Sequence, residues 1–278
     1  MARKKETKRN IRKNRVTAIV AGILALGMIL STATFVGGPM LLEIFAKDRS
    51  NPPGSQWDLE TYREYLIYEI ENLEKHVSEY GPTVAVLEEL AQHYENLIYL
   101  EQILSNESEN LDGYKQNMLK AYRDLIELTP EEPYYRLRLL NAYLVVDEGE
   151  AMISAEVEAL TGMLHETPNL DYNFWFIELL QELEYTAKAR EEIAWLKEYL
   201  AERLSGADAD NTERYYYAYL LAEYEEDKEA ALEQLAIILD EEEAESNLYK
   251  QAELYRDKLM AEDKAEDDDS AADGGADE

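Results

Sequence analysis

The side chains able to perform acid–base or metal chemistry are 60 acidic residues and three histidines, and the chain has no cysteine. His76, His93 and His165 lie far apart in the sequence, and none forms the HxxxH or HExxH spacing that places two imidazoles on one helical face. The carboxylates are so numerous that some must approach one another at catalytic distances by chance, so their pairing indicates no particular reaction. The lack of cysteine excludes disulfides, cysteine-ligated metals and thiol nucleophiles.

The sequence also lacks the short glycine-containing motifs of common catalytic and nucleotide-binding sites. There is no GxSxG, Walker A or GxGxxG pattern. We therefore predict a protein that is not an enzyme, with no catalytic, cofactor-binding or metal-binding residues and no cofactor. The alternative is an envelope hydrolase that uses an unrecognised acidic site.

One long apolar segment lies near the N-terminus. Residues 16–42 contain no ionisable side chain, and a helix of about 20 such residues spans the hydrocarbon core of a bilayer. Residues 1–15 contain eight Lys or Arg side chains and one acid, Glu6. Because basic flanks stay in the cytoplasm, we predict a single-pass plasma-membrane protein with a cytoplasmic N-terminus and an extracytoplasmic main domain.

A cleaved signal peptide is the competing interpretation of this segment. Ser31, Thr32 and Ala33 offer the small side chains that a signal peptidase requires. The apolar run continues to Leu42, which is longer than the core of most signal peptides and favours retention. Residues 43–56 include Pro52, Pro53 and Gly54, and they predict a short linker that no helix crosses.

The chain beyond the membrane segment is strongly acidic. Residues 50–278 contain 57 Asp or Glu and 17 Lys or Arg side chains. A domain with this charge repels phosphate backbones and anionic lipid head groups, so we predict no nucleic-acid binding. Its protein or peptide partners are expected to be neutral or basic, and residues 16–42 provide the contact with the membrane.

Apolar residues after the linker recur at intervals of three and four, which predicts helices. Residues 57–105 indicate a long antiparallel helical hairpin that turns at Gly81 and Pro82, with Glu101 interrupting the apolar spacing of its second helix. Between residues 111 and 260 similar spacings return around successive prolines. Met118, Tyr122, Leu125 and Pro130 give the first copy, and Leu160, Met163 and Pro168 repeat its later gaps.

This pattern resembles tetratricopeptide repeats in degenerate form. The clearest copy places Ala218 and Ala222 on one helical stripe and Ala231, Leu235 and Ile238 on the next. The resemblance implies an all-α fold of stacked antiparallel helix pairs, a TPR-like α-solenoid, over residues 111–260. It also implies a concave surface that binds segments of other proteins.

Residues 261–278 carry nine acids and no apolar side chain larger than alanine. Such a segment buries too little apolar surface to offset the entropy of ordering, so we predict a disordered, solubilising acidic tail. Two alternatives are a docking tail for a basic partner and a weak calcium site at Asp267, Asp268 and Asp269.

The helical body is unusually rich in tyrosine, with 21 in the chain. Tyr215, Tyr216 and Tyr217 cannot all face one core, because adjacent helical residues point about 100° apart. Tyrosine combines a large apolar ring with a polar tip and is common at interfaces. Packing between helices is one interpretation, and a peptide-binding groove is the other, for which the candidate residues are Tyr135, Tyr143, Tyr216 and Tyr219.

These features together predict a membrane-anchored extracytoplasmic TPR-like scaffold that mediates protein–protein interaction in envelope assembly or secretion. A structural alternative is a self-associating spacer at the membrane, in which the chain forms a homo-oligomer through residues 57–105 and the membrane helix.

Overall fold

The computed structural model describes residues 59–104, 110–146, 149–206 and 209–273. The predicted basic N-terminus, membrane helix and linker, residues 1–56, lie outside this part of the chain. Within the described ranges, no helix is both long enough and apolar enough to span a bilayer.

The described residues form ten α-helices and no strand, which confirms the all-α prediction for this part of the chain. In chain order the helices are α3 (Leu59–Tyr80), α4 (Val84–Ile103), α5 (Leu111–Leu128), α6 (Pro133–Ala142), α7 (Glu150–Glu166), α8 (Leu170–Glu182), α9 (Thr186–Leu204), α10 (Asn211–Tyr224), α11 (Lys228–Glu241) and α12 (Asn247–Asp273).

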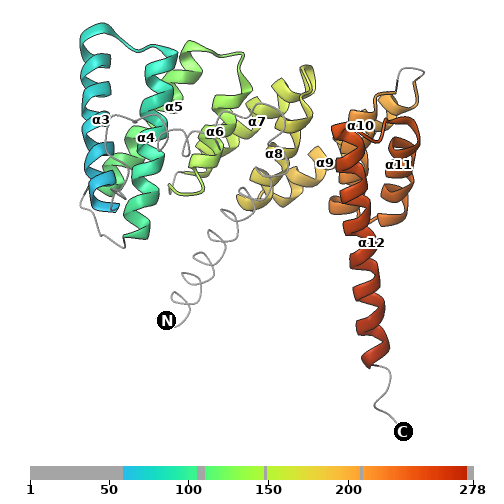
Figure 1. The fold of residues 1–278 in the computed structure, drawn as a ribbon. Helices are drawn as coiled ribbons and strands as arrows, with labels where there is room; N and C mark the ends of the chain where they lie inside the picture. Colours follow the sequence, from blue (N-terminus) through green and yellow to red (C-terminus); the bar gives the residue numbers. More distant parts are fainter. Residues whose placement is uncertain (1–58, 105–109, 147–148, 207–208, 274–278) are drawn as a thin grey trace. The chain divides into compact units, whose positions relative to one another are not determined.

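Each helix packs against the next one along the chain (Figure 1). Alternate helices also meet, because α6 packs against α8 and α10 against α12. The described helices therefore pack mainly against their neighbours along the chain.

Local signals explain where the helices begin and end. Between α3 and α4, Gly81 takes a φ of 86°, and the Thr83 hydroxyl then accepts a hydrogen bond from the amide of Val86 at the start of α4. Asp210 and Asp227 cap α10 and α11 by accepting hydrogen bonds from backbone amides.

Three apolar clusters form the core, and each belongs to helices that are close in the chain. The first runs from α3 to α8 with one contribution from α9, the second joins α8, α9 and α10, and the third joins α10, α11 and α12. Most residues that the periodicity assigned to packing are buried, whereas Met163 and Ala222 are only partly buried. The buried ones are Met118, Tyr122, Leu125, Leu160, Ala218, Ala231, Leu235 and Ile238.

The last helix reaches into the acidic segment 261–278, for which the sequence predicts disorder. Helix α12 continues to Asp273. No glycine or proline occurs between its first residue and Gly274, and the segment contains the strong helix formers Ala, Glu and Lys. Helix propensity therefore provides a physical reason for a helix in this segment.

Two turns of the fold hold a glutamate in the left-handed backbone region. Glu184 follows α8 with a φ of 66°, and Glu226 follows α10 with a φ of 56°. Both are exposed, so neither side chain gains packing energy that would offset the steric cost of this conformation.

We expect glycine to be more stabilising than alanine at both turns, by about 1 kcal/mol each, because only glycine adopts positive φ without a clash. The comparison of Glu184→Gly with Glu184→Ala, and of Glu226→Gly with Glu226→Ala, by urea unfolding measures this difference. The same pair of substitutions at the exposed helical residue Glu158 should give the opposite sign. Equal stability of the glycine and alanine variants at the two turns would contradict the expectation.

Candidate functional site

The four tyrosines predicted to line a groove fall into two environments. Tyr135 and Tyr143 are buried in the first apolar cluster, with exposed fractions of 7% and 4%. Tyr216 and Tyr219 are partly exposed, and both rings contact Phe174 of α8. The structure therefore brings Tyr216 and Tyr219 together, and it places Tyr143 inside the packing between helices.

Aromatic ring contacts join alternate helices in two groups, one between α6 and α8 and the other between α8, α10 and α12. We call this set the aromatic strip. It consists of Tyr134 and Tyr135 in α6, Tyr172, Phe174 and Trp175 in α8, Tyr216, Tyr219 and Tyr224 in α10, and Tyr255 in α12.

The first half of the strip joins α6 to α8. The Tyr134 ring lies 6.4 Å from the ring of Tyr172 and 6.1 Å from that of Trp175, measured between centroids. Tyr135 touches Tyr134 edge-on at 5.4 Å. Tyr134, Tyr172 and Trp175 are all partly exposed, so this half presents aromatic surface to a partner.

The second half of the strip joins α8 to α10 and α12 through Phe174. Its ring is stacked on Tyr216 at 5.6 Å and meets Tyr219 edge-on at 5.4 Å. Tyr224 lies 6.1 Å from Phe174, and Tyr255 lies 5.9 Å from Tyr219. The beginning of α8 is fixed by Asn169, whose side chain accepts a hydrogen bond from the amide of Tyr172.

Carboxylates of neighbouring helices accept hydrogen bonds from the tyrosine hydroxyls of the strip. Tyr135 donates to Glu88 at 2.6 Å, Tyr255 donates to Glu223 at 3.0 Å, and Tyr216 donates to Asp171. Burial raises the pKa of Tyr135, and the bond to Glu88 raises it further. Burial also raises the pKa of Tyr216, with Asp171 adding to the effect. These tyrosines stay neutral, and the acids beside them keep the strip negative.

The clustering of tyrosines in the sequence led to Tyr135, Tyr216 and Tyr219 of this set as groove candidates, but not to the residues of α8. Tyr172, Phe174 and Trp175 lie at one end of a helix whose apolar residues extend over most of its surface. What these residues share with the rest of the strip is their position, since Tyr134, Tyr172 and Tyr216 all lie within five residues of the first residue of alternate helices.

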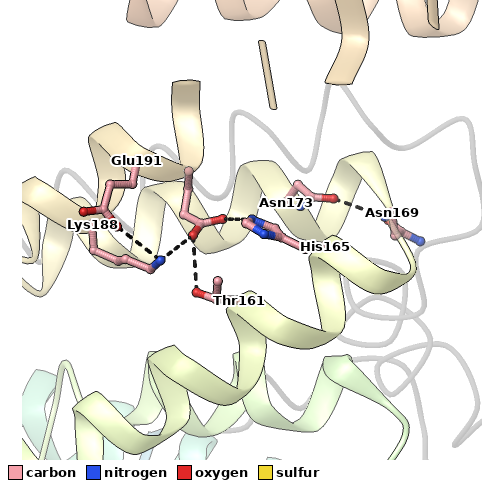
Figure 2. Close-up of polar contacts among 7 residues, drawn as sticks. Thr161, His165, Asn169, Asn173, Lys188 and Glu191 are labelled. Atoms are coloured by element: carbon pink, nitrogen blue, oxygen red, sulfur yellow. Dashed lines mark hydrogen bonds and ion pairs between the residues drawn. The ribbon is translucent and has the colours of Figure 1, made fainter. Parts of the chain in front are cut away.

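The residue types of acid–base chemistry come together at a second place, between α7 and α9 (Figure 2). The Glu192 carboxylate has a side-chain exposure of 3%. It accepts hydrogen bonds from Thr161 at 3.3 Å, from His165 at 2.8 Å and from Lys188 at 2.9 Å. Lys188 also contacts Glu191 at 3.4 Å.

We call Thr161, His165, Lys188 and Glu192 the Glu192 cluster. It joins α7 to α9, and its hydrogen bonds occupy both oxygens of the Glu192 carboxylate. Burial lowers the pKa of Lys188, but the hydrogen bonds and charges of Glu192 and Glu191 outweigh it, so the pKa is raised. The His165 ring is stacked on Trp195 at 3.8 Å. Since both oxygens of Glu192 accept hydrogen bonds from side chains of the two helices, we assign the cluster to holding α7 against α9.

The other histidines lie apart from this cluster. His76 lies near the Tyr80 ring, and burial lowers the pKa of His93 while Glu69 and Glu89 oppose that shift. In the described ranges, no group of three or more His, Cys, Asp or Glu side chains has the geometry of a metal site.

Comparison of the chain with protein-family models, with curated proteins and with solved structures finds no match. The interpretation of the site therefore rests on its own geometry. Partly exposed aromatic rings on adjacent helices supply contact area at small entropic cost, and the acids beside them favour a neutral or basic ligand.

Proposed function

We propose that this protein is a membrane-anchored, extracytoplasmic scaffold whose TPR-like helix pairs bind segments of other proteins. The proposal is carried by the aromatic strip, because it extends over four alternate helices and remains partly exposed in α6, α8 and α10. A surface that crosses several helices suits an extended peptide better than a small molecule, since it offers a line of contacts.

The apolar segment 16–42 supports the anchoring part of the proposal, and the basic residues before it support the orientation. The chain's acidity supports the choice of a neutral or basic partner protein. The combination of a predicted membrane anchor with a binding surface supports a role in envelope assembly or secretion.

Because the chain lacks cysteine, one experiment can test both location and binding. Asp171→Cys lies beside the strip and Glu198→Cys lies on α9, and both replace an exposed acid. A membrane-impermeant photoreactive maleimide is added to intact cells that make the full-length protein. We expect both variants to be labelled, and illumination to attach another protein to Asp171→Cys at least about five times more efficiently.

Each outcome decides one part of the proposal. Labelling that requires permeabilised cells would contradict the extracytoplasmic location. Equal protein adducts at both positions, or none, would contradict binding at the strip. An adduct with a second copy of the same chain would favour the self-associating spacer.

A further inference from the structure

Glu178 is an acidic residue of α8, the helix that contributes Tyr172, Phe174 and Trp175 to the strip. It occupies α8 one turn after Phe174, and residues four apart lie on the same helical face. Phe174 contacts Tyr219 and Tyr224 of α10, and the charge of Glu178 acts on both tyrosines. Glu178 thus lies on the same helical face as Phe174, whose ring contacts α10.

The Glu178 carboxylate differs from the other acids of the strip in its contacts. Glu223 accepts hydrogen bonds from Tyr255 and Lys258, and Asp171 accepts one from Tyr216. Within the described part of the chain, no hydrogen bond or ion pair joins Glu178 to another group.

Three effects oppose a negative charge at this position. Glu178 is partly buried, which removes some of its hydration, and Glu182 places a like charge one turn away. The position is also close to the C-terminal end of α8, where the helix dipole disfavours an anion. Burial, with the Glu182 charge second, accordingly raises the pKa of Glu178.

We propose that Glu178 is the anchor for a lysine or arginine side chain, flanked by apolar residues, in the protein segment that binds the strip. A cation at this position would neutralise the carboxylate and would lie against the faces of Tyr219 and Tyr224, where cation–π attraction adds to the ion pair. The flanking apolar side chains would cover the remaining ring surface. This inference rests on the proposed function, because it names the partner chemistry of the same site.

The test uses the full-length protein in detergent micelles and two labelled peptides, acetyl-Leu-Arg-Leu-amide and the same peptide with citrulline in place of arginine. Citrulline has nearly the shape of arginine without its charge. We expect the arginine peptide to bind the wild type at least about tenfold more tightly, at a salt concentration that screens contacts with exposed acids. Fluorescence anisotropy measures both affinities.

Glu178→Gln should remove the difference between the two peptides. Glu182→Gln is the matched control, because it makes the same charge change one turn away at an exposed residue, and it should retain the difference. Far-UV circular dichroism of both variants checks that the fold is kept.

Two results would overturn the inference. One is failure of the wild type to prefer the arginine peptide, and the other is an equal loss of preference in both variants. Neither result bears on the photocrosslinking at Asp171→Cys, which detects a partner of any charge, so failure of the anchor can be told apart from failure of the scaffold proposal.

Discussion

Raising the pH above about 10 is expected to unfold the helical domain in one steep transition. The pKa is raised for ten tyrosines, in each case by burial first and in several cases by a neighbouring carboxylate as well. They are Tyr62, Tyr94, Tyr122, Tyr135, Tyr172, Tyr215, Tyr216, Tyr219, Tyr224 and Tyr255.

The loss of stability at high pH follows from the raised pKa values of these tyrosines. In the unfolded chain these tyrosines ionise near pH 10, whereas in the folded chain they keep their protons to higher pH. Their contribution to stability is therefore complete below pH 10 and is lost as the pH rises toward the folded values. Each tyrosine that keeps its proton in the folded chain lowers the free energy of unfolding by about 1.4 kcal/mol per pH unit. Several such tyrosines together can therefore cancel the stability of a typical domain within about two pH units.

Simultaneous records of tyrosinate absorbance and far-UV circular dichroism during an alkaline titration test this expectation. About half of the absorbance change should coincide with the loss of helix, because the pKa is raised for ten of the 21 tyrosines. Replacement of the buried Tyr122 by phenylalanine should make the transition less steep, whereas Tyr68→Phe, at a ring that is 60% exposed, should leave it unchanged. Ionisation of these ten tyrosines while the helices persist would contradict the burial of their rings.

Replacing Arg63 by methionine is expected to destabilise the domain by about 3–5 kcal/mol. The Glu101 side chain is fully buried in α4, and the Nε atom of Arg63 in α3 lies 2.6 Å from its Oε1 atom. Its Oε2 atom has no hydrogen-bond partner in the described ranges. Loss of Arg63 would leave a buried carboxylate without a compensating charge, which is the costly way to break such a pair.

Removal of the other member of the pair, Glu101, should destabilise the domain much less. Glu101→Leu removes the buried charge and fills the space with apolar atoms, while the side chain of Arg63, 26% exposed, can turn toward water. Urea unfolding of both single variants and of the double variant measures the coupling. Lys75→Met, which breaks an exposed pair with Glu79, should change the unfolding free energy by less than about 1 kcal/mol. Equal costs for Arg63→Met and Glu101→Leu would contradict the proposed asymmetry.

Helical periodicity predicted the fold class and much of the core. Spacing alone selected Met118 and Leu125 in α5 and Ala231 and Leu235 in α11, and all four are buried. This succeeds because the helical repeat fixes which side chains share a face, whatever that face packs against. The turn at Gly81 was equally predictable, since positive φ favours glycine.

Interactions between helices could not be predicted in the same way. Lys188, one turn before Glu192 on α9, is a partner that the local sequence does indicate. Nothing in the local sequence indicates that Arg63 pairs with Glu101 or that His165 contacts Glu192, because these two partners come from other helices. The strip was found only in part for the same reason. Which rings meet depends on how α6, α8 and α10 pack, whereas the sequence specifies only the face within each helix.

The packing of each helix on its chain neighbours also has a consequence for how the domain folds. Contacts between residues near in sequence close only short loops, so folding can begin at many points and spread without a slow search for distant partners. The same arrangement lets the α10–α12 end open while the α3–α8 end stays formed. A ligand that contacts several helices would therefore couple the two ends of the domain, since local unfolding of either end would break some of its contacts.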